Sequence, residues 1–198
     1  MIGDKQTKLE GYTIIELLVV VLLFSLSMVI LSQTYVSFIR LSRKTANAAV
    51  VQQDMRFTLE YISRAVRNTP IDYSVGISSV SSSLNLISQT GEEIIITLSD
   101  VGAGDTQCFD DVNIRCLRIT KDGGATWAPL TSKNVNVNDF KIFIYPTDSP
   151  FNLIAGSYPN DNQPLVTAEL SLTYQSNQER ERITLDAQTT ISSRNYAR

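Results

Sequence analysis

The feature that most constrains this fold is a long run near the amino terminus with nothing in it to break a helix. Between Tyr12 and Asn68 the sequence contains neither glycine nor proline. Within this run, Leu17 to Ile39 are 23 residues without a charge, which at roughly 1.5 Å per residue would extend about 34 Å as a helix. A bilayer's hydrocarbon core is about 30 Å thick, so the sequence predicts that this segment enters a membrane.

One carboxylate, Glu16, stands at the start of the apolar run. A carboxylate inside a transmembrane segment costs on the order of 2.5 to 3.5 kcal/mol at mid-depth and less near an end, so we expect Glu16 to have a partner. A secretory signal peptide fits poorly, because two acids and two lysines neutralise the first ten residues and no small-x-small cleavage site follows. An uncleaved signal anchor with an incidental glutamate is the alternative.

The order Gly11, Tyr12, Thr13 and then Glu16, in front of an apolar helix, resembles the class III leader of type IV pilins and type II secretion pseudopilins. The resemblance implies that prepilin peptidase cuts between Gly11 and Tyr12 and methylates the new amino terminus of Tyr12. It also implies that Glu16 pairs with the amine of a neighbouring subunit during assembly. A buried carboxylate and a buried ammonium are each costly alone, so bringing them together relieves both penalties.

Beyond the apolar run, the helical pattern changes to that of a helix packed on a core. Glu60 and Arg64 have the i,i+4 spacing of an ion pair, and Pro70 ends the pattern. The predicted buried stripe has intervals of four, four, three and four residues and consists of Val51, Met55, Leu59, Ile62 and Val66.

The remaining sequence predicts a loop over residues 74–83 and then a series of strands. The first four are expected to form two hairpins, because Gly-containing turns separate them. The predicted strands cover residues 84–88, 93–98, 114–120, 126–130, 140–145, 166–174 and 182–191. Short turns imply antiparallel pairing. We therefore expect an α+β, pilin-like fold, in which a long amino-terminal helix spans the membrane with its first half and packs on an antiparallel β-sheet with its second.

The expected organisation has four parts. Residues 1–11 form a prepilin leader, 12–39 a transmembrane and assembly helix, 40–69 its amphipathic continuation, and 70–198 an extracytoplasmic, β-rich globular head.

The head carries two cysteines, Cys108 and Cys116, which we expect to form a disulfide on the extracytoplasmic side. The surrounding acids offer oxygen ligands for calcium, but their spacing is not that of an EF-hand, and a solvated acidic loop is the favoured interpretation. These acids are Asp100, Asp105, Asp110 and Asp111.

The chain has no histidine, which excludes Ser-His-Asp and Cys-His catalysis and the histidine-bearing zinc sites. We expect no enzymatic activity, no cofactor and no metal. Residues 120–127 fit the Asp-box pattern of sialidase-like propellers, but the pattern occurs once and the chain is too short for repeated blades. It predicts a turn-forming device, with Trp127 as a packing residue or, alternatively, an exposed aromatic for ligand contact.

The remaining details favour a minor subunit of such a filament. Removing the first 11 of the 198 residues leaves 187, long for a major subunit. Residues 52–68 are similar to the arginine-rich end of the first helix in W-type minor pilins and J-type minor pseudopilins. The resemblance implies a structural subunit of a type IV pilus or type II secretion filament, held in the inner membrane before extraction. Its expected partners are other pilins or pseudopilins, prepilin peptidase, the inner-membrane assembly platform and membrane lipid.

The alternative is a competence-type or tip pilin whose head binds DNA or a surface. Such a head needs a basic or aromatic patch, and the candidate cluster is Arg115, Arg118, Lys121 and Lys133. The net charge of -3 does not indicate a nucleic-acid-binding surface.

Overall fold

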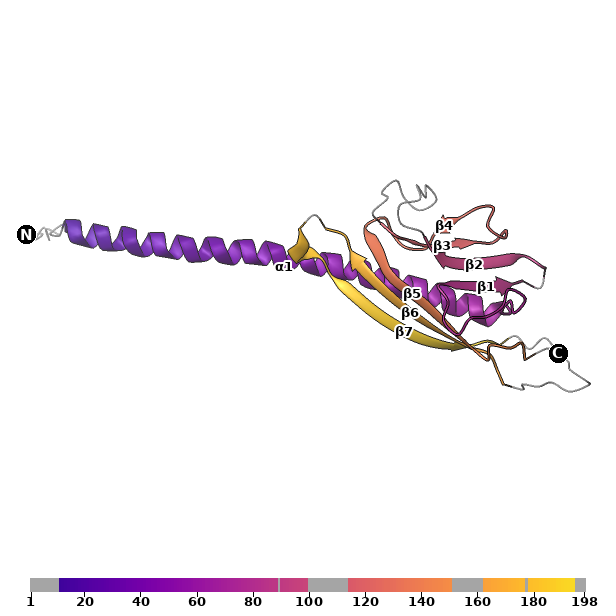
Figure 1. Cartoon of the computed structure of the whole chain (residues 1–198). Coiled ribbons are helices and arrows are strands. Elements are labelled where there is room, and N and C mark those ends of the chain that lie inside the picture. Colours follow the sequence, from indigo (N-terminus) through magenta and orange to yellow (C-terminus); the bar gives the residue numbers. More distant parts are fainter. Residues whose placement is uncertain (1–10, 89, 100–113, 151–161, 177, 195–198) are drawn as a thin grey trace, which may run out of the picture. The chain divides into compact units, whose positions relative to one another are not determined.

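The computed structural model describes residues 11–88, 90–99, 114–150, 162–176 and 178–194. Its first element is one helix, α1 (Ile14–Asn68), and seven strands and a short 3-10 helix, η1 (Glu179–Glu181), follow (Figure 1). The strands are β1 (Ser83–Ile87), β2 (Glu93–Leu98), β3 (Leu117–Thr120), β4 (Ala128–Pro129), β5 (Val135–Tyr145), β6 (Leu165–Tyr174) and β7 (Thr184–Ser192). The α+β architecture expected for a pilin-like fold is confirmed.

The chain divides into two compact units, residues 1–43 and 44–198. The α1 helix contributes to both, and it runs from the residue after Thr13 to the end of the stretch that lacks glycine and proline. Its last turn is extended by a bond from the Thr69 N–H to the Ala65 carbonyl at 2.9 Å, directly before Pro70. The second unit, called the head below, therefore begins inside the helix and not at its end.

The strands of the head form two antiparallel sheets, with strand orders β1-β2-β3-β4 and β5-β6-β7. The two predicted hairpins are β1–β2 and β3–β4. A bridge between Ser81 and Ile142 connects the neighbourhood of the first sheet to β5. Buried residues alternate clearly with less buried ones in β1 and β6 and over most of β5, whereas both residues of β4 are exposed.

Four predicted strand starts differ from the observed ones by two residues or more. β3 begins at Leu117 and not at 114, and the other three differ for physical reasons that the contacts show. β5 begins at Val135 and not at 140, because a bulge between Val137 and Asp139 shifts the alternation of buried residues. β4 lacks Thr126, whose backbone and hydroxyl both bond to Asp122 in the preceding turn. β7 starts at Thr184 because residues 179–181 form η1.

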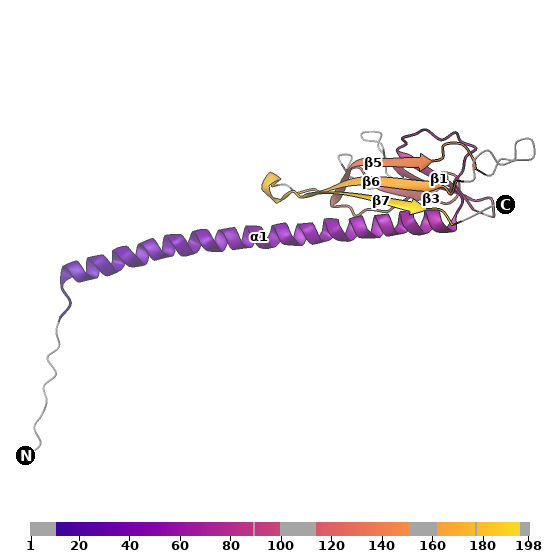
Figure 2. The ribbon, with the colours of Figure 1, turned by 90° about the horizontal axis from the view of Figure 1, so that it is seen from below.

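The core of the head lies where α1 meets the sheets, and Figure 2 shows β5, β6 and β7 running along the carboxyl-terminal part of the helix. The prediction for the helix stripe is wrong at one position: Thr58 is fully buried, whereas Leu59 is half-buried. Residue 58 lies three after Met55 and four before Ile62, so helical geometry puts it on the same face as both. The fully buried partners on the strands include Leu84, Leu86, Ile96, Leu117, Val135, Val137, Ile142 and Leu172.

Polar contacts also fix α1 to the rest of the head. One carboxylate oxygen of Asp54 accepts bonds from the Ser132 N–H at 2.8 Å and the Ser132 hydroxyl at 2.6 Å. The predicted ion pair between Glu60 and Arg64 is confirmed on the exposed side of the helix. The helix is thus held to the loop before β5 as well as to the hydrophobic core.

Candidate functional site

The most unusual surface in the described chain is the first part of α1. Every residue from Gly11 to Phe38 is exposed, and the large apolar side chains from Ile14 to Val36 are between 45% and 83% exposed. Such a continuous apolar surface is too large to be left in water and needs a membrane or a protein partner. Among the described residues, α1 is the helix long and apolar enough to cross a membrane, a property it shares with amino-terminal signal sequences.

Three hydroxyl groups inside this apolar surface donate hydrogen bonds to the backbone of α1 itself. Ser25 donates to the Val21 carbonyl at 2.7 Å, and Ser27 donates to the Leu23 carbonyl at 2.8 Å. Thr34 makes the equivalent bond four residues back, at 2.9 Å. A hydroxyl bonded in this way can lie in an apolar environment without an unsatisfied donor.

The predicted cleavage position lies immediately outside the helix. Gly11, Tyr12 and Thr13 are exposed and have no regular secondary structure, and α1 starts at Ile14. A peptidase that cuts between Gly11 and Tyr12 would therefore cut outside the helix and would leave α1 intact. Cleavage and methylation of Tyr12 stay predictions.

Glu16 lies in the first turn of α1, and its backbone contacts show a helix-capping pattern that the sequence reasoning missed. The Glu16 N–H lies 3.3 Å from the Thr13 hydroxyl and 3.1 Å from the Thr13 carbonyl. Thr13 is therefore the N-cap and Glu16 the third helical residue, the positions of a Thr-x-x-Glu capping box. That pattern is readable in the sequence. The Thr13 side chain thus caps the start of α1, and Glu16 occupies the third helical position, from which a glutamate can complete such a box.

The predicted disulfide and the acidic loop fall largely outside the described residues. Cys116 is fully buried, its N–H donates to the Ser99 hydroxyl at 2.8 Å, and its carbonyl accepts from the Ser99 N–H at 2.9 Å. Its predicted partner Cys108 lies outside the described residues, as do the four acids considered as calcium ligands and interpreted as a solvated loop. Within the part of the chain that the structure describes, no group of three or more Cys, Asp or Glu residues is arranged to hold a metal ion.

The Asp-box segment is a turn, as predicted. Asp122 accepts bonds from the Thr120 hydroxyl at 2.5 Å and from both the N–H and hydroxyl of Thr126, at 2.9 and 2.5 Å. These bonds hold the pKa of the Asp122 carboxyl well below its usual range. Gly123 and Gly124 follow with φ of 66° and 104°, which L side chains rarely adopt.

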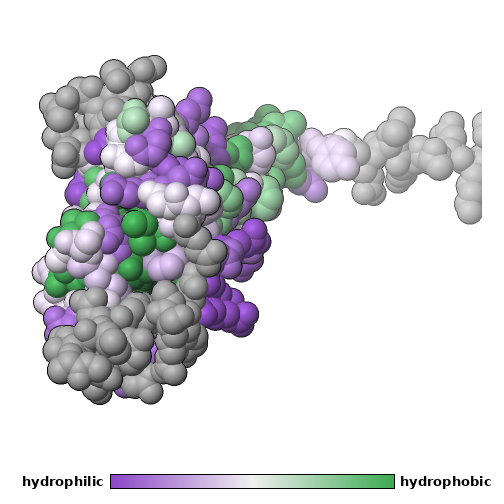
Figure 3. All heavy atoms as spheres, turned by 90° about the vertical axis from the view of Figure 1, so that its right-hand side faces the viewer, coloured by the Kyte–Doolittle hydropathy of each residue, from purple (hydrophilic) through white to green (hydrophobic). Residues whose placement is uncertain are grey.

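The four basic residues proposed for a DNA-binding or adhesive head are partly committed to other contacts. The Arg118 guanidinium lies 4.4 Å from the centre of the half-buried Trp127 ring, a cation–π contact. Arg115 Nη1 donates to the Asn138 carbonyl at 3.4 Å, while Lys121 and Lys133 are exposed. The face of the head in Figure 3 intersperses hydrophilic and hydrophobic residues. These contacts give Trp127 and Arg118 a structural role on β3 and the turn.

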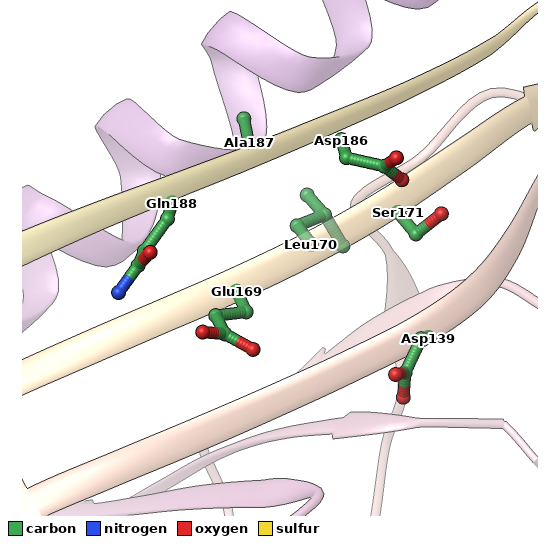
Figure 4. Close-up of a pocket in the computed structure, with 7 residues that line it drawn as sticks. All are labelled: Asp139, Glu169, Leu170, Ser171, Asp186, Ala187 and Gln188. Atoms are coloured by element: carbon green, nitrogen blue, oxygen red, sulfur yellow. The ribbon is translucent and has the colours of Figure 1, made fainter.

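A hollow of about 320 Å³ lies on the β5-β6-β7 sheet, and sequence reasoning did not predict it (Figure 4). Its charged lining consists of Asp139, Glu169 and Asp186, one from each strand. Lys141 forms an ion pair with Asp139, and the hydrogen bond and charge of Asp139, with the charge of Glu169, raise the pKa of Lys141. The alternating pattern in the sequence places the three carboxylates on the face of each strand that points away from the core. Their proximity to one another depends on the strand register, which cannot be read from the sequence.

Comparison of the chain with protein-family models, with characterised proteins and with solved structures gives no match.

Proposed function

We propose that this chain is a non-enzymatic filament subunit, a minor pilin or pseudopilin of a type IV pilus or type II secretion system. The observation that supports this most strongly is the first part of α1, an apolar helical surface exposed on all sides. It is preceded by an exposed Gly11–Tyr12 peptide and begins with a single carboxylate. A membrane covers such a surface during storage, and neighbouring helices cover it in a filament.

In the proposed filament, subunits associate helix to helix through the apolar surface of α1. Packing between apolar helices fixes their axial register weakly, because many offsets bury similar areas. A pair between the Glu16 carboxylate and the amine of Tyr12 on a neighbouring subunit would select one register, since any other offset leaves both charges in an apolar environment.

The proposal includes a location and partners. Before assembly the chain would be a single-pass protein of the inner membrane with an extracytoplasmic head. Prepilin peptidase would process it there, and the inner-membrane assembly platform would extract it with other pilins or pseudopilins. The exposed length of α1 is compatible with these roles because the head core uses residues of α1 only from Val51 onward.

The test is peptide mass spectrometry of the amino terminus, on the protein from cells with and without prepilin peptidase. We expect N-methyl-Tyr12 as the first residue in the presence of the peptidase and the intact leader in its absence. An intact Met1 in both strains, or a cut after Leu31, would contradict the proposal and indicate an anchor or an exported domain.

A further inference from the structure

Within the described residues the two sheets end in four edge strands, β1, β4, β5 and β7. The edge of β1 is closed by the chain that precedes it. The Asp72 N–H donates to the Asn85 carbonyl at 3.1 Å, and the Ile87 N–H donates to the Pro70 carbonyl at 3.0 Å. The edge of β4 is short, because the strand consists of Ala128–Pro129 and its proline lacks an N–H. Neither edge offers a long row of free backbone groups.

The edge of β5 is also occupied. Ser81 and Ile142 exchange backbone bonds of 2.9 and 2.7 Å, and the Val137 N–H donates to the Arg115 carbonyl at 2.9 Å. The bulge after Val137 bends the strand as well.

The edge of β7 is different from the other three. The strand has nine residues, pairs with β6 without a register shift, and is the outermost strand of its sheet in Figure 1. It contains no proline, lysine or arginine, which are the residues that usually protect an exposed edge from pairing. A regular edge of this length is a template for one more strand.

The register shows which backbone groups of β7 point outward. The Tyr174 N–H donates to the Ile183 carbonyl and the Ser193 N–H to the Pro164 carbonyl, both at 2.9 Å. In an antiparallel pair, hydrogen-bonded positions alternate, so the odd-numbered residues of β7 bond to β6 and the even-numbered ones face away. Within the described residues nothing bonds to the outward N–H and C=O groups of Thr184, Asp186, Gln188 and Thr190.

The acid-lined hollow lies directly beside this edge, on the face where the even-numbered side chains of β7 are exposed. One row across the sheet is Asp139, Ser171 and Asp186, and the next row on this face is Lys141, Glu169 and Gln188. Figure 4 shows the members of both rows that line the hollow. Among the described residues, Lys141 is the cation in ion-pair contact with this group, through Asp139. The hollow therefore has a surplus of negative charge next to free backbone groups.

We propose that the β7 edge accepts an extended segment of a partner protein as a fourth strand, with arginine or lysine on the side that faces the hollow. The backbone of the segment pairs with the four outward residues of β7. A basic side chain opposite Asp186 is its direct cross-strand neighbour, and one opposite Gln188 reaches Asp186 on the diagonal. On the opposite face of the sheet, apolar side chains of the added strand pack beside Leu185 and Ala187 and bury these half-buried residues further. This inference does not depend on the proposed filament role.

Charge argues against a second copy of this chain as the occupant. β7 carries one charged residue, Asp186, so pairing two β7 edges would add a carboxylate to each acidic hollow and bring no cation. Like charges facing each other across strands are destabilising. The partner segment therefore differs from β7 in charge.

The test uses the full chain in detergent micelles and two fluorescent nine-residue peptides, the length of β7. Both alternate valine with threonine; one carries two arginines on the threonine face and the other two glutamates. By fluorescence anisotropy we expect the arginine peptide to bind at least tenfold more tightly and to lose affinity as salt is raised. Hydrogen exchange on the unmodified chain should then slow at the four outward amides of β7. No binding, equal binding of both peptides, or unchanged exchange at β7 would overturn the proposal.

Two sets of variants separate the backbone contribution from the charge contribution. Gln188→Pro removes an outward N–H without removing a bond to β6 and should weaken binding about tenfold or more, while Gln188→Ala keeps the N–H and should bind like the parent. The double change Asp186→Asn with Glu169→Gln should weaken the arginine peptide about fivefold, as expected for a cross-strand charge pair. Dimers of the full chain that Gln188→Pro disperses would instead assign the edge to a second copy.

Discussion

The hydroxyl of Thr58 is an unsatisfied polar group in the centre of the packing between α1 and the sheets. Thr58 is fully buried, and within the described residues its Oγ1 has no hydrogen-bond partner. Thr58→Val keeps the shape and removes the hydroxyl, so we expect the free energy of unfolding to rise by about 1 kcal/mol. Thr58→Ser is the matched control, because it keeps the hydroxyl and deletes a methyl group, and it should lower stability by about 1 kcal/mol. Urea unfolding measures both; a less stable Thr58→Val protein would show that the hydroxyl has a partner.

Tyr73 gives the head a predictable sensitivity to alkali. Burial raises the pKa of Tyr73 to about 12, and its hydroxyl has no partner among the described residues. The folded chain therefore holds this proton more strongly than the unfolded chain does, whose pKa is about 10. The contribution of the protonated Tyr73 side chain to the free energy of unfolding is fully present below pH 10 and is lost as the pH rises towards 12.

Comparing Tyr73→Phe with the parent protein tests this expectation. The parent should lose stability relative to Tyr73→Phe above pH 10, and the two should follow parallel curves between pH 7 and 9. Tyr145→Phe, at a tyrosine that is 60% exposed, is the control and should leave the alkaline loss in place. Parallel curves for parent and Tyr73→Phe up to pH 12 would show that Tyr73 titrates as in the unfolded chain.

At the scale of the secondary-structure elements, the turn around Asp122 contributes to the stability of the head, and this contribution is lost in acid. Its hydrogen bonds to Thr120 and Thr126 depress the pKa of Asp122 in the folded chain. The turn is therefore supported above the unfolded value of about 3.9 and loses this support as the pH falls through the folded value. We expect the difference in unfolding free energy between the parent and Asp122→Ala to shrink from pH 5 to pH 2. A difference that is constant with pH would show that the carboxylate charge does not act in the turn.

The sequence predicts an element well when the residues that determine it are neighbours in the chain, and poorly when a distant partner strand determines it. The missing helix breakers predicted α1 almost to its ends, and the turn glycines predicted both hairpins because backbone conformation at a glycine is a local property. The start of β5 was missed because a bulge interrupts the alternation, and a bulge is defined by its partner strand. The acidic hollow was missed for the same reason: Asp139, Glu169 and Asp186 are far apart in sequence and meet through strand register.

At the scale of the whole molecule, the boundary between the two units predicts which fragments fold. Residues 44–198 contain the entire described core, including Val51, Met55, Ile62 and Val66 of α1. We expect this fragment to be monomeric and to unfold cooperatively in the absence of detergent. A fragment of residues 70–198 loses the four buried apolar side chains of α1, each worth about 1.5 to 3 kcal/mol, which together approach the whole stability of an ordinary domain of about 5 to 15 kcal/mol. It should show no cooperative transition, and a cooperative one would mean that the sheets fold without α1.

The assembly role proposed for the Glu16 charge must be separated from any effect of a substitution on the start of α1, and the choice of substitution does this. Glu16→Gln removes the charge and keeps a residue type that completes a capping box, whereas Glu16→Ala removes both. If the charge aligns neighbouring subunits, both variants are cut after Gly11 and both are absent from sheared filaments, because the amine of the neighbouring subunit stays unpaired. Thr13→Val is the converse control: it loses the cap seen at Thr13 but keeps the charge, and it should still enter filaments. Recovery of Glu16→Gln in filaments at the parental level would show that assembly does not need the charge of Glu16.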